Sequence, residues 1–268
     1  MIEVIAFSCP LLLAATGALF SEYAGCLAIF LDGAITLSGF LTYLFTVVTG
    51  SVAVGIVLSC VCVTAVSLGF AWIVEKTGAE RFIAAIAINL FYGAVVSFLS
   101  SAVFGTRGVL TSDRFVFRTP GVNAFSVCVT FVIIAVALVF LTRSQKGIYF
   151  RITGSNPDVL LVRGVNPGLY RILSWGISAL AAGIAGTIMV LRISSFVPNL
   201  ASGKGWLALA AVFMGRKKLW LIAVFAVLFC VVEYGAVLLQ SVLPGIPSSV
   251  VLALPYIILL CTLLLLRD

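Results

Sequence analysis

The sequence predicts an all-α, polytopic membrane protein. Hydrophobic residues make up 63% of its 268 residues and charged residues only 9%, whereas a soluble domain carries about 25% charged residues. At about 20 residues per helical span, the chain has room for roughly eight to ten spans. We therefore expect residues 1–268 to form a single transmembrane domain, and the function must come from the helix bundle itself.

Apolar runs separated by polar or glycine-rich segments predict about nine spans. One of these runs is too short to cross a membrane alone, and we expect it to be a broken helix that is completed by the loop before it and lines a cavity. This short run is Gly205–Met214. The predicted spans lie near Ile2–Phe20, Ala34–Thr49, Ser51–Ile73, Phe82–Phe104, Val122–Leu141, Leu169–Leu191, Gly205–Met214, Leu219–Gln240 and Ser249–Leu266.

The basic residues predict which way the chain is inserted. With the N-terminus outside and the C-terminus inside, eleven of the 16 Lys and Arg residues fall on the inner side and five on the outer side, as the enrichment of basic residues in cytoplasmic loops requires. The inner residues are Lys76, Arg81, Arg143, Lys146, Arg151, Arg163, Arg171, Arg216, Lys217, Lys218 and Arg267, and the outer ones are Arg107, Arg114, Arg118, Arg192 and Lys204. This distribution accounts for the net charge of +7 without nucleic-acid binding.

The stretch "GSNPDVLLVRGVNPG", from Gly154 to Gly168, predicts a short helix with signals at both ends. Asn156 is a good capping residue, Pro157 fits the first helical position, Asp158 complements the positive helix end, and Gly164 allows a left-handed stop. A helix of about seven residues rises only about 10 Å, so it cannot cross a membrane. We expect it to lie on the surface, in a cytoplasmic segment over residues 143–168.

The two halves of the chain resemble each other. Residues 11–40 and 179–215 each contain a Gly- and Ala-rich span, a polar break with glycine, and a second Gly- and Ala-rich span. The predicted topology gives them opposite orientations, as in transporters with inverted repeats and broken helices. The alternative is that Gly and Ala serve only close packing between helices.

Cysteine and histidine usage gives no indication of a metal site. The sequence contains no His, and its seven Cys are scattered through apolar runs. The nearest pair, Cys60 and Cys62, would point away from each other on a helix. We expect small, reduced packing residues and no bound metal.

The run "GSNPDVLLVRGVNPGLYRILSWGISALAAGIAGTIMVLRISSFVPNLASGKGWLALAAVFMGR" resembles the membrane subunits of ATP-binding-cassette (ABC) importers of the branched-chain amino acid, simple-sugar and nucleoside class. In that family an Asn-Pro segment followed by Gly-(Ile/Val)-Asn forms a cytoplasmic coupling helix, and a Pro-then-Gly-rich break precedes an Ala-Ala-x-x-x-Gly-(Arg/Gly) stretch. The segments "PLLLAATGALFSEYAGCLAIFLDGAITLSGF" and "ERFIAAIAINLFYGAVVSFL" are also similar to it. The chain departs from the family at Ala28 and Asp32, where Asn and Glu are usual, so local polar contacts there are expected to differ.

The resemblance implies a permease subunit whose short helix fits a groove on a partner ATPase. The chain has no GxxxxGK[ST] phosphate loop, so ATP, Mg²⁺ and hydrolysis belong to that separate ATPase subunit, and this chain is no enzyme and needs no cofactor. The other implied partners are a second, homologous or identical permease subunit and an extracytoplasmic solute-binding protein, at a bacterial inner membrane. A helix that merely rests on lipid is the alternative. The candidate coupling residues are Asn156, Pro157, Asp158, Val159, Leu160, Leu161, Arg163 and Gly164.

Polar and aromatic residues near the predicted breaks are candidates for the translocation path. They suit a solute with a ring and hydroxyl groups, such as a nucleoside, riboflavin or a simple sugar. Glu233 is unusual because an acidic residue inside a span is costly in lipid; it either bonds Tyr234 or a polar neighbour, or lines the path. The alternative function is a secondary transporter with Glu233 or Asp32 as its proton site. The candidate path residues are Phe20, Ser21, Asn89, Phe91, Ser195, Phe196, Asn199, Trp206 and Glu233.

Overall fold

The structure, a computed structural model, describes residues 2–117, 119–242, 254, 256, 257 and 260. Within these residues it is all helical, with ten named helices and one isolated β-bridge but no strand. The helices are α1 (Ile2–Tyr23), α2 (Leu31–Thr49), α3 (Val52–Thr77), α4 (Arg81–Phe104), α5 (Thr119–Arg143), α6 (Gln145–Ser155), α7 (Pro157–Val162), α8 (Pro167–Ile193), α9 (Lys204–Met214) and α10 (Leu219–Val242).

Seven of the described helices are long and apolar enough to cross a membrane: α1, α2, α3, α4, α5, α8 and α10. The all-helical prediction is therefore confirmed, and each of the seven corresponds to a span predicted from the apolar runs. α9 has 11 residues and falls short of a full crossing, as expected for Gly205–Met214. The predicted span near Ser249–Leu266 lies outside the continuously described residues.

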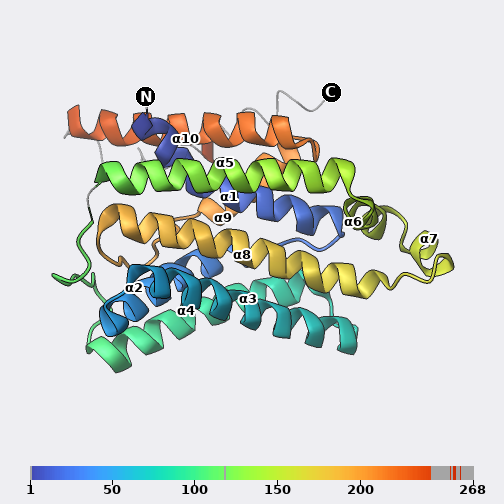
Figure 1. Cartoon of the computed structure of the whole chain (residues 1–268), viewed down its shortest axis with the longest axis horizontal. Helices are drawn as coiled ribbons and strands as arrows, with labels where there is room; N and C mark the ends of the chain where they lie inside the picture. The colour runs from blue at the N-terminus through green and yellow to red at the C-terminus, as the bar shows by residue number, and fades with distance from the viewer. Residues whose placement is uncertain (1, 118, 243–253, 255, 258–259, 261–268) are drawn as a thin grey trace.

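The long helices lie side by side along one axis, and α6 and α7 project from one end of the bundle, which we call the α7 end (Figure 1). α1, α2 and α8 are the most enclosed of the candidate spans. Their Gly and Ala residues allow close backbone approach: a Cβ on Gly17 of α1 would lie 2.7 Å from Ala181 Cβ of α8, and a Cβ on Gly186 would overlap the Ile35 carbonyl of α2. Small residues at such crossings are typical of helix packing in membranes.

The connections after α1 and after α8 each begin at a close contact with another part of the chain. α1 ends at the α7 end, where the Tyr23 hydroxyl donates to the Lys217 carbonyl at 2.5 Å. α8 ends at the opposite end, and there Phe196 forms a two-bond antiparallel bridge with Leu110, with N···O distances of 2.8 and 3.0 Å. The connections 24–30 and 194–203 therefore start from opposite ends of the bundle and lead to the N-termini of α2 and α9 (Figure 1).

The N-termini of α2 and α9 are in direct contact. A Cβ on Gly205, the second residue of α9, would lie 2.8 Å from Asp32 Cα and closer still to the Asp32 nitrogen. The connection before α9 turns through left-handed backbone at three non-glycine residues, Ser194, Asn199 and Ser202, which all have positive φ. The fold thus brings together two helix starts that lie 173 residues apart in sequence.

Candidate functional site

The starts of α2 and α9 depend on polar groups from other helices. The first turn of a helix leaves backbone N–H groups without partners, and in a membrane such groups must be satisfied by protein. The residues before the two helices, Phe30 and Gly203, make no side-chain cap. Instead, Asp32 Oδ1 accepts from the Gly205 N–H of α9 at 3.1 Å, and Asn89 Oδ1 of α4 accepts from the Gly33 N–H of α2 at 2.7 Å.

The charge of Asp32 also suits its place at the N-terminus of α9. A carboxylate at a helix N-terminus interacts favourably with the positive end of the helix dipole. The side chain of Asp32 therefore holds the start of α9 directly. This is one of the positions at which the sequence departs from the family that it resembles. Asn89, predicted as a path residue, has its side-chain oxygen occupied by the start of α2.

A buried ion pair joins α9 to α10. Lys204, the first residue of α9, pairs through Nζ with Glu233 Oε1, and the two side chains are 7% and 18% exposed. Glu233 Oε2 is buried and has no hydrogen-bond partner among the described residues. Lys204 Nζ also lies 5.2 Å from the Phe7 ring centroid of α1. These contacts connect α1, α9 and α10 at one point.

Arg192 of α8 approaches the same ring. Its guanidinium carbon lies 5.4 Å from the Phe7 centroid, and its Nη1 donates to the Ala6 carbonyl at 3.0 Å. Two cations therefore lie near one aromatic ring, an arrangement that the ring's negative face favours. Tyr234, which was considered as a partner of Glu233, instead packs edge-on against Phe7 at 5.7 Å.

Sequence reasoning missed Lys204. It was assigned to an outer loop, but the structure buries it at the start of α9. The available signal was the presence of one Lys beside a glycine-rich break and one Glu inside a later apolar span. A lone acidic residue in a span predicts a nearby cation.

Three candidate path residues take part in packing between helices. Ser21 Oγ lies 3.0 Å from Ser178 Oγ of α8, and both groups are buried. Phe20 contacts Phe150 of α6 edge-on, with ring centroids 5.7 Å apart. Phe196 is 1% exposed and contacts Phe40 at 5.3 Å. These side chains stabilise the bundle at separate points.

The remaining candidate path residues lie apart from one another, and most of them are exposed. Phe91 is 44% exposed on α4 and contacts Phe70 of α3, whereas Trp206 is 49% exposed on α9. Asn199 is exposed in the connection before α9, and Ser195 is buried at its start. The structure thus brings Glu233 into a polar cluster but does not gather the nine candidates around one cavity.

The short helix α7 forms as predicted, but one residue shorter. Pro157 is its first residue and Val162 its last, while Gly164 follows with φ of 71°. Asn156 makes no side-chain cap. The Asn that does cap is Asn166, whose Oδ1 accepts from the Gly168 N–H at 2.8 Å at the start of α8.

The exposed part of α7 is apolar. Val159, Leu161 and Val162 are 40%, 58% and 89% exposed, whereas Leu160 is fully buried. Leu160 therefore holds α7 onto its own chain, and its carbonyl accepts from the Val165 N–H at 2.9 Å. Asp158 and Arg163 lie at the two ends of α7 and are exposed. The candidate coupling residues thus separate into one buried anchor and an exposed surface.

The described residues form a bundle of seven candidate membrane-spanning helices, in which the starts of α2 and α9 meet and the short helix α7 exposes apolar side chains at one end. This is the architecture of a polytopic membrane protein. The chain belongs to the family described as "Branched-chain amino acid transport system / permease component", whose family model matches residues 1–263. It is thus a permease component of an ABC importer.

Two curated relatives match nearly the whole chain, and a third matches about half of it. The guanosine ABC transporter permease protein NupQ of Bacillus subtilis is 26% identical, over 97% of this chain and 89% of the relative. The nucleoside ABC transporter permease protein NupC of Lactococcus lactis is 24% identical, over 98% and 90%. The ribose import permease protein RbsC of Escherichia coli K12 is 27% identical, over 55% and 47%.

A solved structure has a similar fold. PsaBC from Streptococcus pneumoniae in complex with Fab superimposes with a TM-score of 0.59 over 98% of this chain and 89% of the other chain. The two sequences are 11% identical, so this similarity concerns the fold alone.

The ion pair between α9 and α10 gives a prediction for stability. Lys204→Met leaves the Glu233 carboxylate buried without its cation, which should cost about 3 kcal/mol. Lys204→Met with Glu233→Met removes both charges and should recover most of the loss. Thermal unfolding of the purified protein in detergent measures this, with exposed Lys146→Met as the matched control. Equal losses in the single and double variants would contradict the assignment of a mutually dependent pair.

Proposed function

We propose that this permease carries a nucleoside or a simple sugar with a pentose ring. The observation that carries the proposal is that relatives aligned over nearly the whole chain are named for guanosine and nucleosides, with a further relative named for ribose. Riboflavin, which was also expected from the resemblance, carries an open hydroxylated chain in place of a pentose ring and is not supported by these relatives. It therefore enters the test as a competitor.

The proposed transporter contains two permease subunits, an ATPase dimer and a binding protein. The chain pairs with a second, homologous or identical permease, and an ATPase dimer binds ATP and Mg²⁺ and docks on α7. An extracytoplasmic binding protein delivers the solute to the opposite end of the bundle. The absence of a GxxxxGK[ST] loop from the sequence and the exposed apolar surface of α7 support this division of labour.

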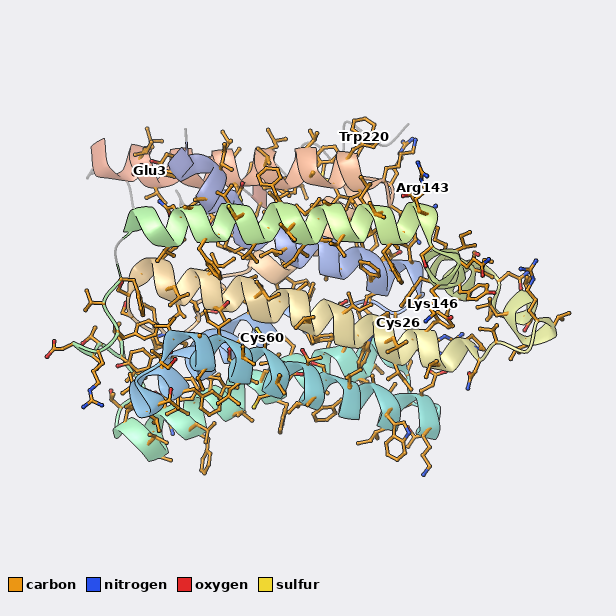
Figure 2. All side chains as sticks on the ribbon, viewed as in Figure 1. Glu3, Cys26, Cys60, Arg143, Lys146 and Trp220 are labelled. Atoms are coloured by element: carbon orange, nitrogen blue, oxygen red, sulfur yellow. The ribbon has the colours of Figure 1, made fainter. Side chains whose placement is uncertain are left out.

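The distribution of basic residues supports an orientation with the α7 end in the cytoplasm. Concentration of Lys and Arg at one end is typical of the cytoplasmic side. The far end has Arg107, Arg114 and Arg192, while Lys204 lies inside the bundle and Arg118 and Arg267 fall outside the described residues. The basic residues of α6, and those near helix ends or in loops on the α7 side, are Lys76, Arg81, Arg143, Lys146, Arg151, Arg163, Arg171, Arg216, Lys217 and Lys218. Arg143 and Lys146 are labelled at this end, opposite Glu3, in Figure 2.

We also infer that the two breaks form an inverted pair. The connection 24–30 starts from the α7 end and the connection 194–203 from the opposite end, and the helices that follow them meet at Asp32 and Gly205. Such paired broken helices are typical of transporters in which opposite ends of a solute path open alternately. The predicted repeat supplies the sequence counterpart of this geometry.

The alternative of an ion-driven transporter with a free carboxylate is less well supported. Glu233 is engaged by Lys204, and Asp32 accepts from the start of α9. Both carboxylates therefore have a structural partner.

The test is uptake into proteoliposomes that contain this chain, its partner permease and its ATPase, with the binding protein outside. We expect labelled guanosine or labelled ribose to accumulate only when ATP is hydrolysed on the ATPase side, and an excess of the accumulated solute to compete more strongly than riboflavin. Ionophores that collapse ion gradients should leave uptake unchanged. Uptake that persists without the ATPase and disappears with ionophores would contradict the proposal and support the ion-driven alternative.

A labelling experiment tests the orientation. In a cysteine-free background, Cys introduced at exposed Asp113 should react with an impermeant thiol reagent in intact cells, and Cys at exposed Ser155 should not. Permeabilised cells provide the control, because both positions should then react. Reaction at position 155 in intact cells would refute both the orientation and a cytoplasmic α7.

Substitutions on α7 test the docking surface. Leu161→Asp and Val162→Asp place a charge on exposed apolar positions, so the chain should fold normally but retain much less ATPase during purification. Co-purification and uptake should fall together, while exposed Gln145→Ala should leave both unchanged. Leu160 is unsuitable for this test because it is buried and its replacement would disturb α7 itself. Normal assembly and transport of both Asp variants would mean that α7 is not a docking helix.

A further inference from the structure

The helix that precedes α7 touches the first break through bare backbone. A Cβ on Gly154 of α6 would lie 2.7 Å from the Gly25 nitrogen and 3.1 Å from the Ala24 carbonyl carbon, and it would overlap the Tyr23 carbonyl oxygen. The contact is reciprocal, because a Cβ on Gly25 would lie 3.1 Å from Gly154 Cα. No side chain therefore separates α6 from residues 23–25, and a shift of one backbone must displace the other.

Further contacts join the loop between α9 and α10 to the same place. The Arg151 guanidinium of α6 lies 5.1 Å from the Tyr23 ring centroid, and the Tyr23 hydroxyl donates to the Lys217 carbonyl at 2.5 Å. Lys217 Nζ pairs with Glu22 at 3.0 Å. The end of α1 is thus held between α6 and the loop that immediately follows α9.

The connection from Gly25 to Asp32 is short and enclosed. Its residues Ala28, Phe30 and Leu31 are fully buried, and the Phe30 ring contacts Trp175 of α8 at 5.2 Å. The Cys26 N–H donates to the Ser21 carbonyl at 2.9 Å. A packed segment of this kind transmits a displacement because it has little free volume to absorb it.

We propose that Gly154 and Gly25 form the junction through which movement of α7 reaches the two broken helices. The junction acts on α9 in two places: at its start, through the connection 24–30 and the Asp32 carboxylate, and just past its end, through Tyr23 and Lys217. Gly154 and Gly25 are positioning residues in this scheme, since they contact neither solute nor ATPase. The inference rests on the proposed function, in which α7 receives the motion of the ATPase.

The decisive variant is Gly154→Ala in the complete transporter. The added methyl group separates α6 from residues 23–25 while the exposed surface of α7 stays intact. We expect the ATPase to co-purify as with the unaltered chain and ATP hydrolysis to continue, while the solute moved per ATP falls about tenfold, within the usual range of coupling energies. Gly69→Ala on α3 is the matched control, because a Cβ there meets nothing within 4 Å.

Gly25→Ala needs its own control, because Gly25 has φ of 72° and any side chain there is strained. Gly78 has φ of 67° but open space around its Cβ, so Gly78→Ala carries the strain without the contact. We expect only Gly25→Ala to lower the solute moved per ATP. Tyr23→Phe is a milder third variant, which removes the bond to Lys217 without adding volume and serves if the glycine variants do not accumulate.

The outcomes separate this inference from the function on which it rests. If the unaltered chain neither binds the ATPase nor transports, the proposed function fails. If the unaltered chain transports and the accumulating junction variants move as much solute per ATP as their controls, the junction is refuted and the function stands. Loss of ATPase co-purification in Gly154→Ala would also refute it, because the contact would then serve docking and not transmission.

Discussion

The arrangement of this bundle depends on how the N-terminal N–H groups of α2 and α9, which start inside the bundle, are hydrogen-bonded. A helix that starts inside a membrane protein leaves backbone N–H groups without intrahelical acceptors. Lipid tails offer no acceptor and the bilayer core contains no water, so the protein must supply the acceptors. Here Asn89 of α4 accepts from the start of α2, and Asp32 of α2 accepts from the start of α9. Each interrupted helix is therefore fixed by the helix packed against it, and the order α4, α2, α9 forms a chain of dependence.

The interior contains two kinds of contact, which differ in how much relative movement they allow. Bare backbone contacts, such as Gly186 against Ile35 and Gly154 against Gly25, leave almost no freedom of relative movement. Long polar side chains, such as those of Lys204 and Glu233, can follow a partner over some distance while keeping their attraction. The bundle thus combines rigid crossings around α8 with an extensible link between α9 and α10.

The sequence predicted features whose determinants lie within a few residues. Pro157 and Gly164 bound α7 because helix starts and stops are local, and the shortness of Gly205–Met214 identified α9 as incomplete. The cap at Asn156 was predicted wrongly, because it connects α6 directly to α7 and its N–H donates to Ile152, while Asn166 makes the cap. The contact between Asp32 and Gly205 leaves no local pattern in a single sequence. The isolated Glu233 indicated a nearby cation without identifying Lys204 as that cation.

The candidate path residues also show what a single sequence does not reveal, which is the direction in which a side chain points from its helix. Phe91 and Asn89 are only two positions apart on α4, yet the first is exposed and the second bonds α2, because helix rotation sets their directions and the apolar run contains little periodicity to reveal it. Trp206 and Lys204 differ in the same way on α9. Knowing that a residue lies near a break therefore did not determine whether it faces the interior.

The bridge between Leu110 and Phe196 ties the connection between α4 and α5 to the second break by two peptide hydrogen bonds. Peptide groups are the same in every residue except proline, so this bridge does not depend on which side chains the connection between α4 and α5 displays. Exposed positions around it, such as Arg107 and Arg114, can therefore change during evolution without loss of these two hydrogen bonds. The link from that surface to the connection before α9 would be inherited unchanged.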